Sequence, residues 1–312
     1  MSQAVQLTVI RLRTADQEYQ GLAINLVEPG DLITTDVLEG LILPADLDRS
    51  REVILYGKAP IWLYAYLINC CVDVPWLACY DMRLGMAVVV ASQIEWPLVG
   101  DVLQLQFSQN PGLAILIGGP PDSGKSVLSY ALYRSLCQYY PHLQIYLYRA
   151  NWDGEGNWKF ESDDSKYINS LVEANTYRIH QLPNADDLLP QYFLYHADAI
   201  ANIQKVVDLV IVDVGGRSHG VKLPVVKSCS HYLVISKSPA EVASWHELCG
   251  SYLGNIAVIH SVLDNICEVI AEGDYFEMVA GPWLTGKTNS VPAVLLERID
   301  QVLTDWKKLP RR

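Results

Sequence analysis

A glycine-rich run around one lysine is the strongest chemical pattern in the sequence. Residues 119–126 read GPPDSGKS and match the pattern Gly-x-x-x-x-Gly-Lys-Ser/Thr, with an apolar strand pattern before them and a helical pattern after them. In such a loop the backbone N–H groups surround a β-phosphate, the lysine reaches the β- and γ-phosphate oxygens, and the last hydroxyl binds Mg²⁺. The sequence therefore predicts ATP and Mg²⁺ as ligands. The predicted ATP-binding residues are Gly119, Ser123, Gly124, Lys125 and Ser126.

Acidic residues that would complete the Mg²⁺ site follow other predicted strands. Asp213 closes the apolar run at residues 209–212, the position where a P-loop enzyme carries the carboxylate that holds the metal directly or through water. Asp153 and Glu155 lie in the segment DGEG and are further candidates for the metal or the attacking water. Simpler interpretations stay open, because a strand-ending aspartate often caps the next element and DGEG can be a plain acidic turn. Arg217 is either a stabiliser of transition-state charge or a surface arginine.

A carboxylate and a guanidinium also lie close together in the first third of the chain. Asp81 and Arg83 belong to the segment YDMRLG, directly after an apolar run. A guanidinium fork can hold a phosphodiester through two hydrogen bonds, and a carboxylate can bind a divalent ion or accept a proton. The alternative is a local ion pair between the two side chains that only shapes the turn.

The elements that must position Asp81 and Arg83 form a small α/β domain, predicted over residues 1–109. Residues 5–14 and 19–27 alternate apolar and polar side chains, which predicts a half-buried hairpin. A helix is predicted to begin at Pro60, because proline suits the first turn of a helix. Further along are a short helical candidate at residues 31–40 and strands at residues 53–56, 75–80, 86–91 and 101–107.

The phosphate loop belongs to a second predicted domain, residues 112–312, which follows a polar linker at residues 108–112. Near-continuous Val, Ile and Leu runs alternate with helical segments there, which is typical of a mostly parallel sheet covered on both faces. The predicted strands are residues 113–117, 144–148, 207–212, 232–236 and 256–260. We therefore predict an α/β protein in which a small α/β domain is followed by a P-loop NTPase domain.

Composition excludes several classes of protein. The chain has 312 residues, of which 50% are hydrophobic and 19% charged, and its net charge is −12. Neither half carries the basic stripe that long duplex nucleic acid requires. The longest apolar run, residues 61–68, is far shorter than the roughly 18 residues of a membrane span, so no membrane partner is expected. We expect a cytoplasmic protein whose seven cysteines are reduced, with no metal or disulfide role.

Three short segments resemble a known family. Residues 57–63 read GKAPIWL, residues 80–85 read YDMRLG, and residues 153–158 read DGEGNW. Together they resemble the CRISPR-associated ring nucleases of type III systems, in the longer form fused to a P-loop (AAA-type) ATPase domain. The resemblance implies binding and cleavage of cyclic tetra-adenylate, or cleavage of RNA near a 3′ adenosine, with Mn²⁺. It also implies a homotetramer that encloses the ligand.

The sequence departs from that family in one respect. Small members use histidines on both sides of the Y-D-x-R turn, whereas residues 1–141 contain no histidine. The aligned positions hold Asp73 and either Ser92 or Gln93. The predicted catalytic residues are therefore Asp81, Arg83 and Asp73, and Asp81 is also the candidate metal ligand. Catalysis by acids without histidine requires raised carboxylate pKa values, a bound metal or a group from elsewhere such as His219.

Two functions follow from these patterns. The first is a ring nuclease or 3′-deadenylating ribonuclease, assisted by the ATP-binding domain, that removes cyclic tetra-adenylate. The second is a sensor, in which the first domain only binds cyclic oligoadenylate and the P-loop domain, an ATPase or kinase-like transferase, produces the output. The missing histidines favour the sensor, and the retained Asp81 and Arg83 favour the nuclease.

Overall fold

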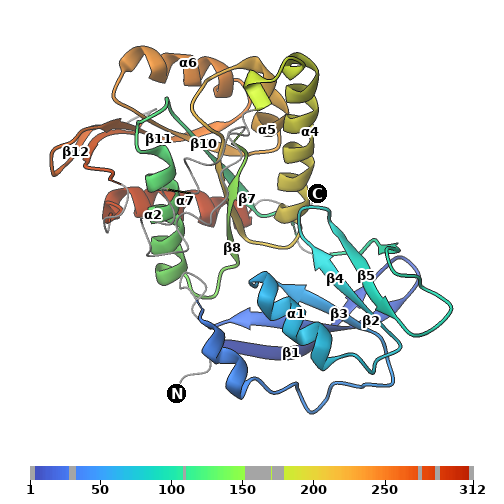
Figure 1. Ribbon diagram of the computed structural model, residues 1–312. Helices are drawn as coiled ribbons and strands as arrows, with labels where there is room; N and C mark the ends of the chain where they lie inside the picture. Colours follow the sequence, from blue (N-terminus) through green and yellow to red (C-terminus); the bar gives the residue numbers. More distant parts are fainter. Residues whose placement is uncertain are drawn as a thin grey trace. The chain divides into compact units, whose positions relative to one another are not determined.

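The chain forms two compact units, Met1–Gln109 and Asn110–Arg312, each with its own hydrophobic core (Figure 1). The computed structural model describes residues 4–27, 33–107, 110–151, 170, 179–272, 276–284 and 289–308. The segment DGEG, with Asp153 and Glu155, lies outside the described residues.

One six-stranded sheet forms the first unit. In the order of the sheet its strands are β1 (Val5–Arg13), β2 (Glu18–Leu26), β3 (Val53–Gly57), β4 (Trp76–Asp81), β5 (Met86–Ser92) and β6 (Val102–Leu103). Strands β2, β3 and β4 run parallel to one another, and the remaining neighbours are antiparallel. The short 3-10 helix η1 (Thr35–Gly40) and the helix α1 (Ile61–Cys70) complete the unit.

Helix α1 covers one face of this sheet. Leu63 and Leu67 are completely buried and belong to the same core cluster as Val53 and Leu55 of β3. The helix begins one residue later than predicted, because Pro60 has an extended backbone and occupies the N-cap. Parallel pairing of β3 with β4 requires a crossover, and α1 supplies it.

The last strand of the first unit is much shorter than predicted. A strand was expected over residues 101–107, but β6 pairs with β5 only through Val102 and Leu103. The chain then turns to the other end of the sheet order, where Gln106 forms an isolated bridge with Arg13 of β1. A hydrogen bond from the Gln106 N–H to the Arg13 carbonyl, 2.7 Å long, replaces the pairing that a longer β6 would make.

The second unit is a seven-stranded, mostly parallel sheet. Its strands are β7 (Leu113–Gly118), β8 (Ile145–Arg149), β9 (Leu209–Asp213), β10 (His231–Ser236), β11 (Gly254–Ser261), β12 (Ile266–Ala271) and β13 (Glu277–Gly281). They lie in the order β12-β13-β11-β10-β7-β9-β8, and only β12 is antiparallel to its neighbour. The sequence predicted the first five of these strands to within a few residues but missed β12 and β13.

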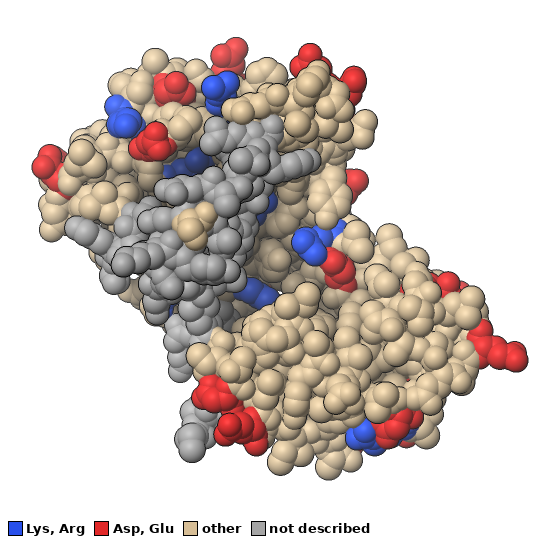
Figure 2. Space-filling view, in the orientation of Figure 1, with Lys and Arg blue, Asp and Glu red and all other residues tan. Residues whose placement is uncertain are grey.

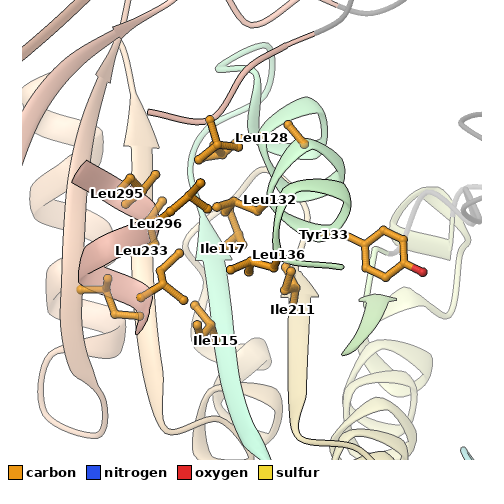
Figure 3. Packing of buried hydrophobic residues seen from close by; sticks show 14 of the residues in the cluster. Ile115, Ile117, Leu128, Leu132, Tyr133, Leu136, Ile211, Leu233, Leu295 and Leu296 are labelled. Carbon is orange, nitrogen blue, oxygen red and sulfur yellow. The ribbon is translucent and has the colours of Figure 1, made fainter. Parts of the chain in front are cut away.

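Helices cover both faces of the second sheet. On one face, α2 (Lys125–Tyr139) and α7 (Ala293–Lys308) pack on alternate residues of the strands, and Leu132 and Leu296 lie in the same cluster as Ile117 and Leu233 (Figure 3). On the other face, α4 (Ala185–Gln204) contacts β7 and β9, and α6 (Pro239–Cys249) contacts β10. The short helix α5 (Leu223–Lys227) lies against α4 and α6. The remaining elements are the 3-10 helices η3 (Ile179–Gln181) and η4 (Gly220–Lys222).

The surface agrees with the charge pattern of the sequence. On the face shown in Figure 2, Lys and Arg side chains stand in small separate groups, and no continuous basic band crosses the described residues of that face. Among the described residues, no helix is both long enough and apolar enough to span a membrane.

Candidate functional site

The predicted phosphate loop connects the carboxyl end of β7 to the start of α2. Gly119 has a φ of 155°, and a Cβ atom there would lie 2.1 Å from the carbonyl oxygen of Ile235 on β10. Only glycine permits that close approach, so the loop can pass tightly over the neighbouring strand. Gly124 occupies the N-cap of α2, and Lys125 and Ser126 form the first turn of that helix. The backbone N–H groups of a helix start are suited to bind phosphate.

Asp213 lies beside this loop, as the sequence predicted for a Mg²⁺-binding acid. It is the last residue of β9, opposite Ile117 of β7 in the parallel register. Its carboxylate is almost fully buried and lies 3.9 Å from the ammonium nitrogen of Lys125. The structure therefore brings together the lysine of the loop and the acid of the adjacent strand, the pair that a P-loop site needs.

A second cation, Arg149, lies in the same place and was not predicted. It is the last residue of β8 and is opposite Asp213 in the β8–β9 register. The Arg149 Nε lies 3.4 Å from the Asp213 carboxylate, and an Arg149 Nη donates a 3.2 Å hydrogen bond to the Ser126 hydroxyl. Its position in the sequence could have identified it. Arg149 is one residue beyond the strand predicted at residues 144–148, so it was expected at the carboxyl edge of the sheet, where α/β proteins bind ligands.

These charges decide the protonation state of Asp213. Burial works to raise its pKa, but the charges of Lys125 and Arg149 outweigh burial and hold the pKa below its ordinary value. The carboxylate is therefore ionised at neutral pH and suits a hard divalent cation.

The residues around the loop fit a nucleotide with Mg²⁺. Ser126 and Asp213 supply the oxygen ligands that Mg²⁺ prefers, and Lys125 supplies a cation for the phosphates. The hydroxyl of Ser123 is buried in the loop and has no hydrogen-bond partner within the described part of the chain. A buried polar group without a partner is costly, and a bound phosphate would supply one.

Loops from two further strands meet at this edge of the sheet. Gly216, in the loop after β9, lies so close to Pro121 of the phosphate loop that a Cβ atom would come within 2.7 Å of its ring. After β8, the carbonyl of Asn151 accepts a 2.6 Å hydrogen bond from Tyr192 of α4. Arg217 is exposed, and His219 is an exposed residue whose Nδ1 caps η4 by accepting a hydrogen bond from the Val221 N–H.

In the first unit, Asp81 and Arg83 form a compact turn at the carboxyl end of β4. One Asp81 oxygen accepts hydrogen bonds from the backbone N–H groups of Arg83 and Leu84, at 2.8 and 3.3 Å. The other oxygen forms a 3.2 Å ion pair with the Arg83 guanidinium, whose side chain is 52% exposed. The local ion pair that the sequence left open as an alternative is therefore present, and about half of the Arg83 side-chain surface still faces solvent.

The loop after β3 leaves the sheet beside this turn. Leu55 of β3 pairs with Cys79 of β4 in a parallel register, which places Gly57 level with Asp81. Lys58 follows Gly57, so its backbone leaves the sheet at the same edge as the Asp81–Arg83 turn. The sequence contained this lysine in the segment GKAPIWL, but only the sheet order assigns it to the same edge as the Y-D-x-R turn.

Asp73 is not part of that arrangement. It precedes β4, so it lies beyond the opposite end of the strand, and the six residues of β4 alone span roughly 16 Å. There it forms a two-bonded ion pair with Arg49, with distances of 2.7 and 2.5 Å. Ser92 and Gln93 lie at this same end, because Ser92 pairs with Trp76 and Gln93 bonds to Pro75. Within one chain, the structure therefore does not bring Asp73 together with Asp81 and Arg83.

The acid-base properties of these carboxylates differ from what acid-only catalysis requires. Burial tends to raise the pKa of Asp81, but the hydrogen bonds and charge of Arg83 outweigh it and leave the pKa below its ordinary value. The hydrogen bonds from Arg49 lower the pKa of Asp73 as well. Both groups are therefore ionised at neutral pH, and neither can donate a proton there.

A Mn²⁺ site is not assembled by the described residues of a single chain. Asp81 is the one carboxylate of the turn, and its oxygens are already bonded to Arg83. No cluster of three or more His, Cys, Asp or Glu side chains occurs among the residues that the structure describes.

Comparison with known proteins identifies the first unit's relatives. Residues 26–104 match the model of a family described as CRISPR-associated protein (Cas_csx3). An uncharacterised protein of Aquifex aeolicus (strain VF5) is 42% identical over 78 residues, which make up 24% of this chain and 68% of that protein.

Three solved structures are similar to the chain in fold. The kinase domain of the Escherichia coli tyrosine kinase ETK is 20% identical, with a TM-score of 0.33, over 47% of this chain and 67% of that one. A putative plasmid partition protein from Borrelia burgdorferi B31, bound to AMPPNP, is 11% identical, with a TM-score of 0.41, over 64% of this chain and 100% of that one. A single-substitution variant of Cyanothece McdA in complex with ATP is 12% identical, with a TM-score of 0.34, over 65% of this chain and 82% of that one.

Proposed function

The N-terminal part of this chain belongs to the CRISPR-associated Csx3 family, and from this premise we propose that the chain is a CRISPR ancillary phosphodiesterase assisted by an ATP-hydrolysing unit. Its proposed substrate is cyclic tetra-adenylate or a short RNA that ends in adenosine. The proposed domains are residues 1–109 for the adenylate ligand and residues 112–312 for ATP. A homotetramer is the proposed assembly, as in the family that the sequence resembles.

ATP hydrolysis is the activity that the geometry supports best. The observation that carries it is the convergence of Lys125, Ser126 and Asp213 at the carboxyl edge of a parallel sheet. In this proposal Lys125 binds the β- and γ-phosphate oxygens, while Ser126 and Asp213 hold Mg²⁺. Held by these residues, Mg²⁺ would supply charge neutralisation for the phosphates. Asp153 and Glu155 remain candidates for orienting the attacking water.

Arg83 is the proposed phosphodiester-binding group of the first unit. Its guanidinium is held by Asp81, yet half of its side chain is exposed, so it can bind an anion without losing that support. Lys58, at the same edge of the sheet, adds positive charge for the adjacent phosphate. Asp81 orients Arg83 and, because it is ionised, could accept a proton from the nucleophile.

The sensor is a second candidate, and one observation favours it. Cleavage of a phosphodiester requires a group that protonates the leaving oxygen, but Asp81 and Asp73 have lowered pKa values and no histidine precedes residue 142. A single chain that binds the ring without cutting it would instead pass a signal to the P-loop unit. A homotetramer offers a nuclease a further source of acid groups, because a second chain can contribute them.

Phosphate release from ATP, measured with and without unlabelled cyclic tetra-adenylate, tests the ATPase and separates the two candidates. We expect Mg²⁺-dependent release in both. A sensor predicts faster release that persists for as long as the ring is present, because the ring is not consumed. A nuclease predicts that any stimulation decays as the ring is cut. No phosphate release under any condition would contradict the assignment of residues 112–312 as an ATPase.

A further inference from the structure

Arg149 contacts the two groups that the proposed function assigns to Mg²⁺. Its guanidinium lies 3.4 Å from the Asp213 carboxylate and donates a hydrogen bond to the Ser126 hydroxyl. The Arg149 and Asp213 side chains are both nearly inaccessible to solvent, at 4% and 2% exposure. The contact is therefore a buried, charge-assisted bridge between the start of α2 and the end of β9.

Mg²⁺ and this guanidinium require the same oxygen atoms. A metal held by Ser126 uses a lone pair of its hydroxyl oxygen, and Arg149 binds that same atom. Two cations on one hydroxyl and one carboxylate would repel each other strongly in a buried site, where water screens them poorly. Simultaneous occupation is therefore unfavourable, even though a hydroxyl has two lone pairs.

The fold allows the side chain to leave while its backbone stays fixed. Arg149 is paired with Asp213 across the parallel β8–β9 ladder, so its Cα position is set by the sheet. Its long side chain has several rotatable bonds, so displacement of the guanidinium from Ser126 requires rotation of the side chain and no change in the pairing of the strand. The other cation of the site, Lys125, lies on α2 and keeps its position beside Asp213.

We propose that Arg149 is a built-in competitor of Mg²⁺ at the phosphate loop. It holds Ser126 and Asp213 in place as a positioning residue, and the metal of a Mg²⁺–nucleotide complex must displace it from both. The phosphates of a metal-free nucleotide can attract the guanidinium, but they supply no cation to replace it on the Ser126 hydroxyl and the buried Asp213 carboxylate. This inference rests on the proposed ATP-binding function. It implies that the site prefers the Mg²⁺ complex of the nucleotide to the metal-free nucleotide.

The test is the Mg²⁺ concentration that gives half-maximal binding of a fluorescent ADP analogue to the full chain. Removing the competitor in Arg149→Gln should lower this midpoint by about tenfold, the usual effect of one charge-assisted hydrogen bond. Arg149→Lys keeps the charge but loses the fork that reaches two groups, so its midpoint should fall by about threefold. Arg134→Gln, an exposed arginine on α2, removes the same charge and should leave the midpoint unchanged.

A midpoint that is unchanged or raised in Arg149→Gln would overturn the competition while leaving nucleotide binding established. Failure of the wild-type chain to bind the ADP analogue at any Mg²⁺ concentration would overturn the proposed ATP site, and this inference with it. If Arg149→Gln does not fold, as judged by circular dichroism, the wild-type chain supplies the test by NMR. The side-chain N–H signal of Arg149 should shift more when Mg²⁺ is added to the ADP-bound protein than when ADP is added alone, because only the metal replaces the guanidinium on Ser126 and Asp213. A shift that is complete with ADP alone would contradict the proposal.

Discussion

Lys125 is the residue on which the nucleotide site depends most directly. Its ammonium lies in the phosphate loop beside Asp213, so Lys125→Ala removes a charged donor to the β- and γ-phosphates. We expect ATP affinity to fall by roughly 10- to 150-fold, which corresponds to about 1.5–3 kcal/mol for a hydrogen bond to a charged group. Equilibrium binding measures the effect, with Lys308→Ala at the exposed end of α7 as the control. Unchanged affinity in Lys125→Ala would remove the phosphate-loop assignment.

Substitution of Asp213 should impair ATP hydrolysis more than ATP binding. Asp213→Asn keeps the shape of the side chain but loses the charge that holds Mg²⁺ or its waters. We expect the variant to bind ATP and to lose most of its phosphate release. The ATP-bound state is the appropriate one to compare, because phosphate then neutralises Lys125 and Arg149. Normal turnover in this variant would place the metal-binding acid elsewhere, with Asp153 and Glu155 next in line.

Arg83 and Asp81 should have distinguishable roles in the first unit. Arg83→Ala removes the exposed guanidinium and should weaken binding of labelled cyclic tetra-adenylate by about 1.5–3 kcal/mol, roughly 10- to 150-fold. Asp81→Ala should lower cleavage with a smaller loss of binding, because Asp81 does not itself contact the anion. Arg11→Ala, whose side chain is 81% exposed, is the control for loss of positive charge. Equal binding by Arg83→Ala and the wild type would exclude the proposed phosphate contact.

Local patterns predicted some residues of the candidate site and could not predict others. The loop residues Gly119 to Ser126 lie in one continuous segment, so their spacing alone identifies the motif. Arg149 lies at the candidate site through its register with Asp213, 64 positions further on, and no local pattern contains that pairing. Asp73 was grouped with Asp81 on alignment, but the strand between them carries the two residues to opposite edges of the sheet.

At the scale of elements, the packing of α4 against β8 should make stability depend on pH. His196 of α4 is hydrogen-bonded to the Tyr148 hydroxyl of β8 at 2.6 Å, and burial lowers the pKa of His196 to about 4. The unfolded chain, with a histidine pKa near 6.5, therefore binds a proton between pH 6.5 and pH 4 that the folded chain does not. The resulting stability is present above pH 6.5 and is lost as the pH falls toward 4.

Thermal or denaturant unfolding at pH 7 and pH 5 measures this dependence. We expect His196 to contribute a loss of about 2 kcal/mol between these two values. His196→Gln should be less stable at pH 7, because it loses packing and the bond to Tyr148, but its stability should fall less steeply on acidification. An equally steep fall in the variant would show that other groups cause the acid sensitivity.

Sequence patterns predicted strands where side chains are buried continuously or alternate regularly, and failed where most of the strand is exposed. Strands β7, β9 and β10 are buried along nearly their whole length, and uninterrupted apolar runs identify them. Strand β12 is exposed at five of its six positions, so its composition does not distinguish it from a loop. Strand β6 was predicted too long because residues 104–107 have strand-like composition but turn away toward β1.

At the scale of the whole molecule, two units with separate cores allow two activities to be tested separately. The first unit contains no histidine, and its acids are ionised at neutral pH, so we expect residues 1–110 alone to cleave far more slowly than the full chain. The proposed reason is that residues 112–312 promote assembly or contribute a group. Equal rates for the fragment and the full chain would remove that cooperation and place the nuclease site entirely on the first unit.

Incubation of the full chain with labelled cyclic tetra-adenylate and Mn²⁺, with and without ATP and Mg²⁺, is the decisive measurement of the proposed phosphodiesterase. We expect conversion of the ring to shorter linear adenylates, and faster conversion when ATP is present. An intact ring after prolonged incubation with active, ATP-hydrolysing protein would contradict the phosphodiesterase and leave the sensor as the function of the chain.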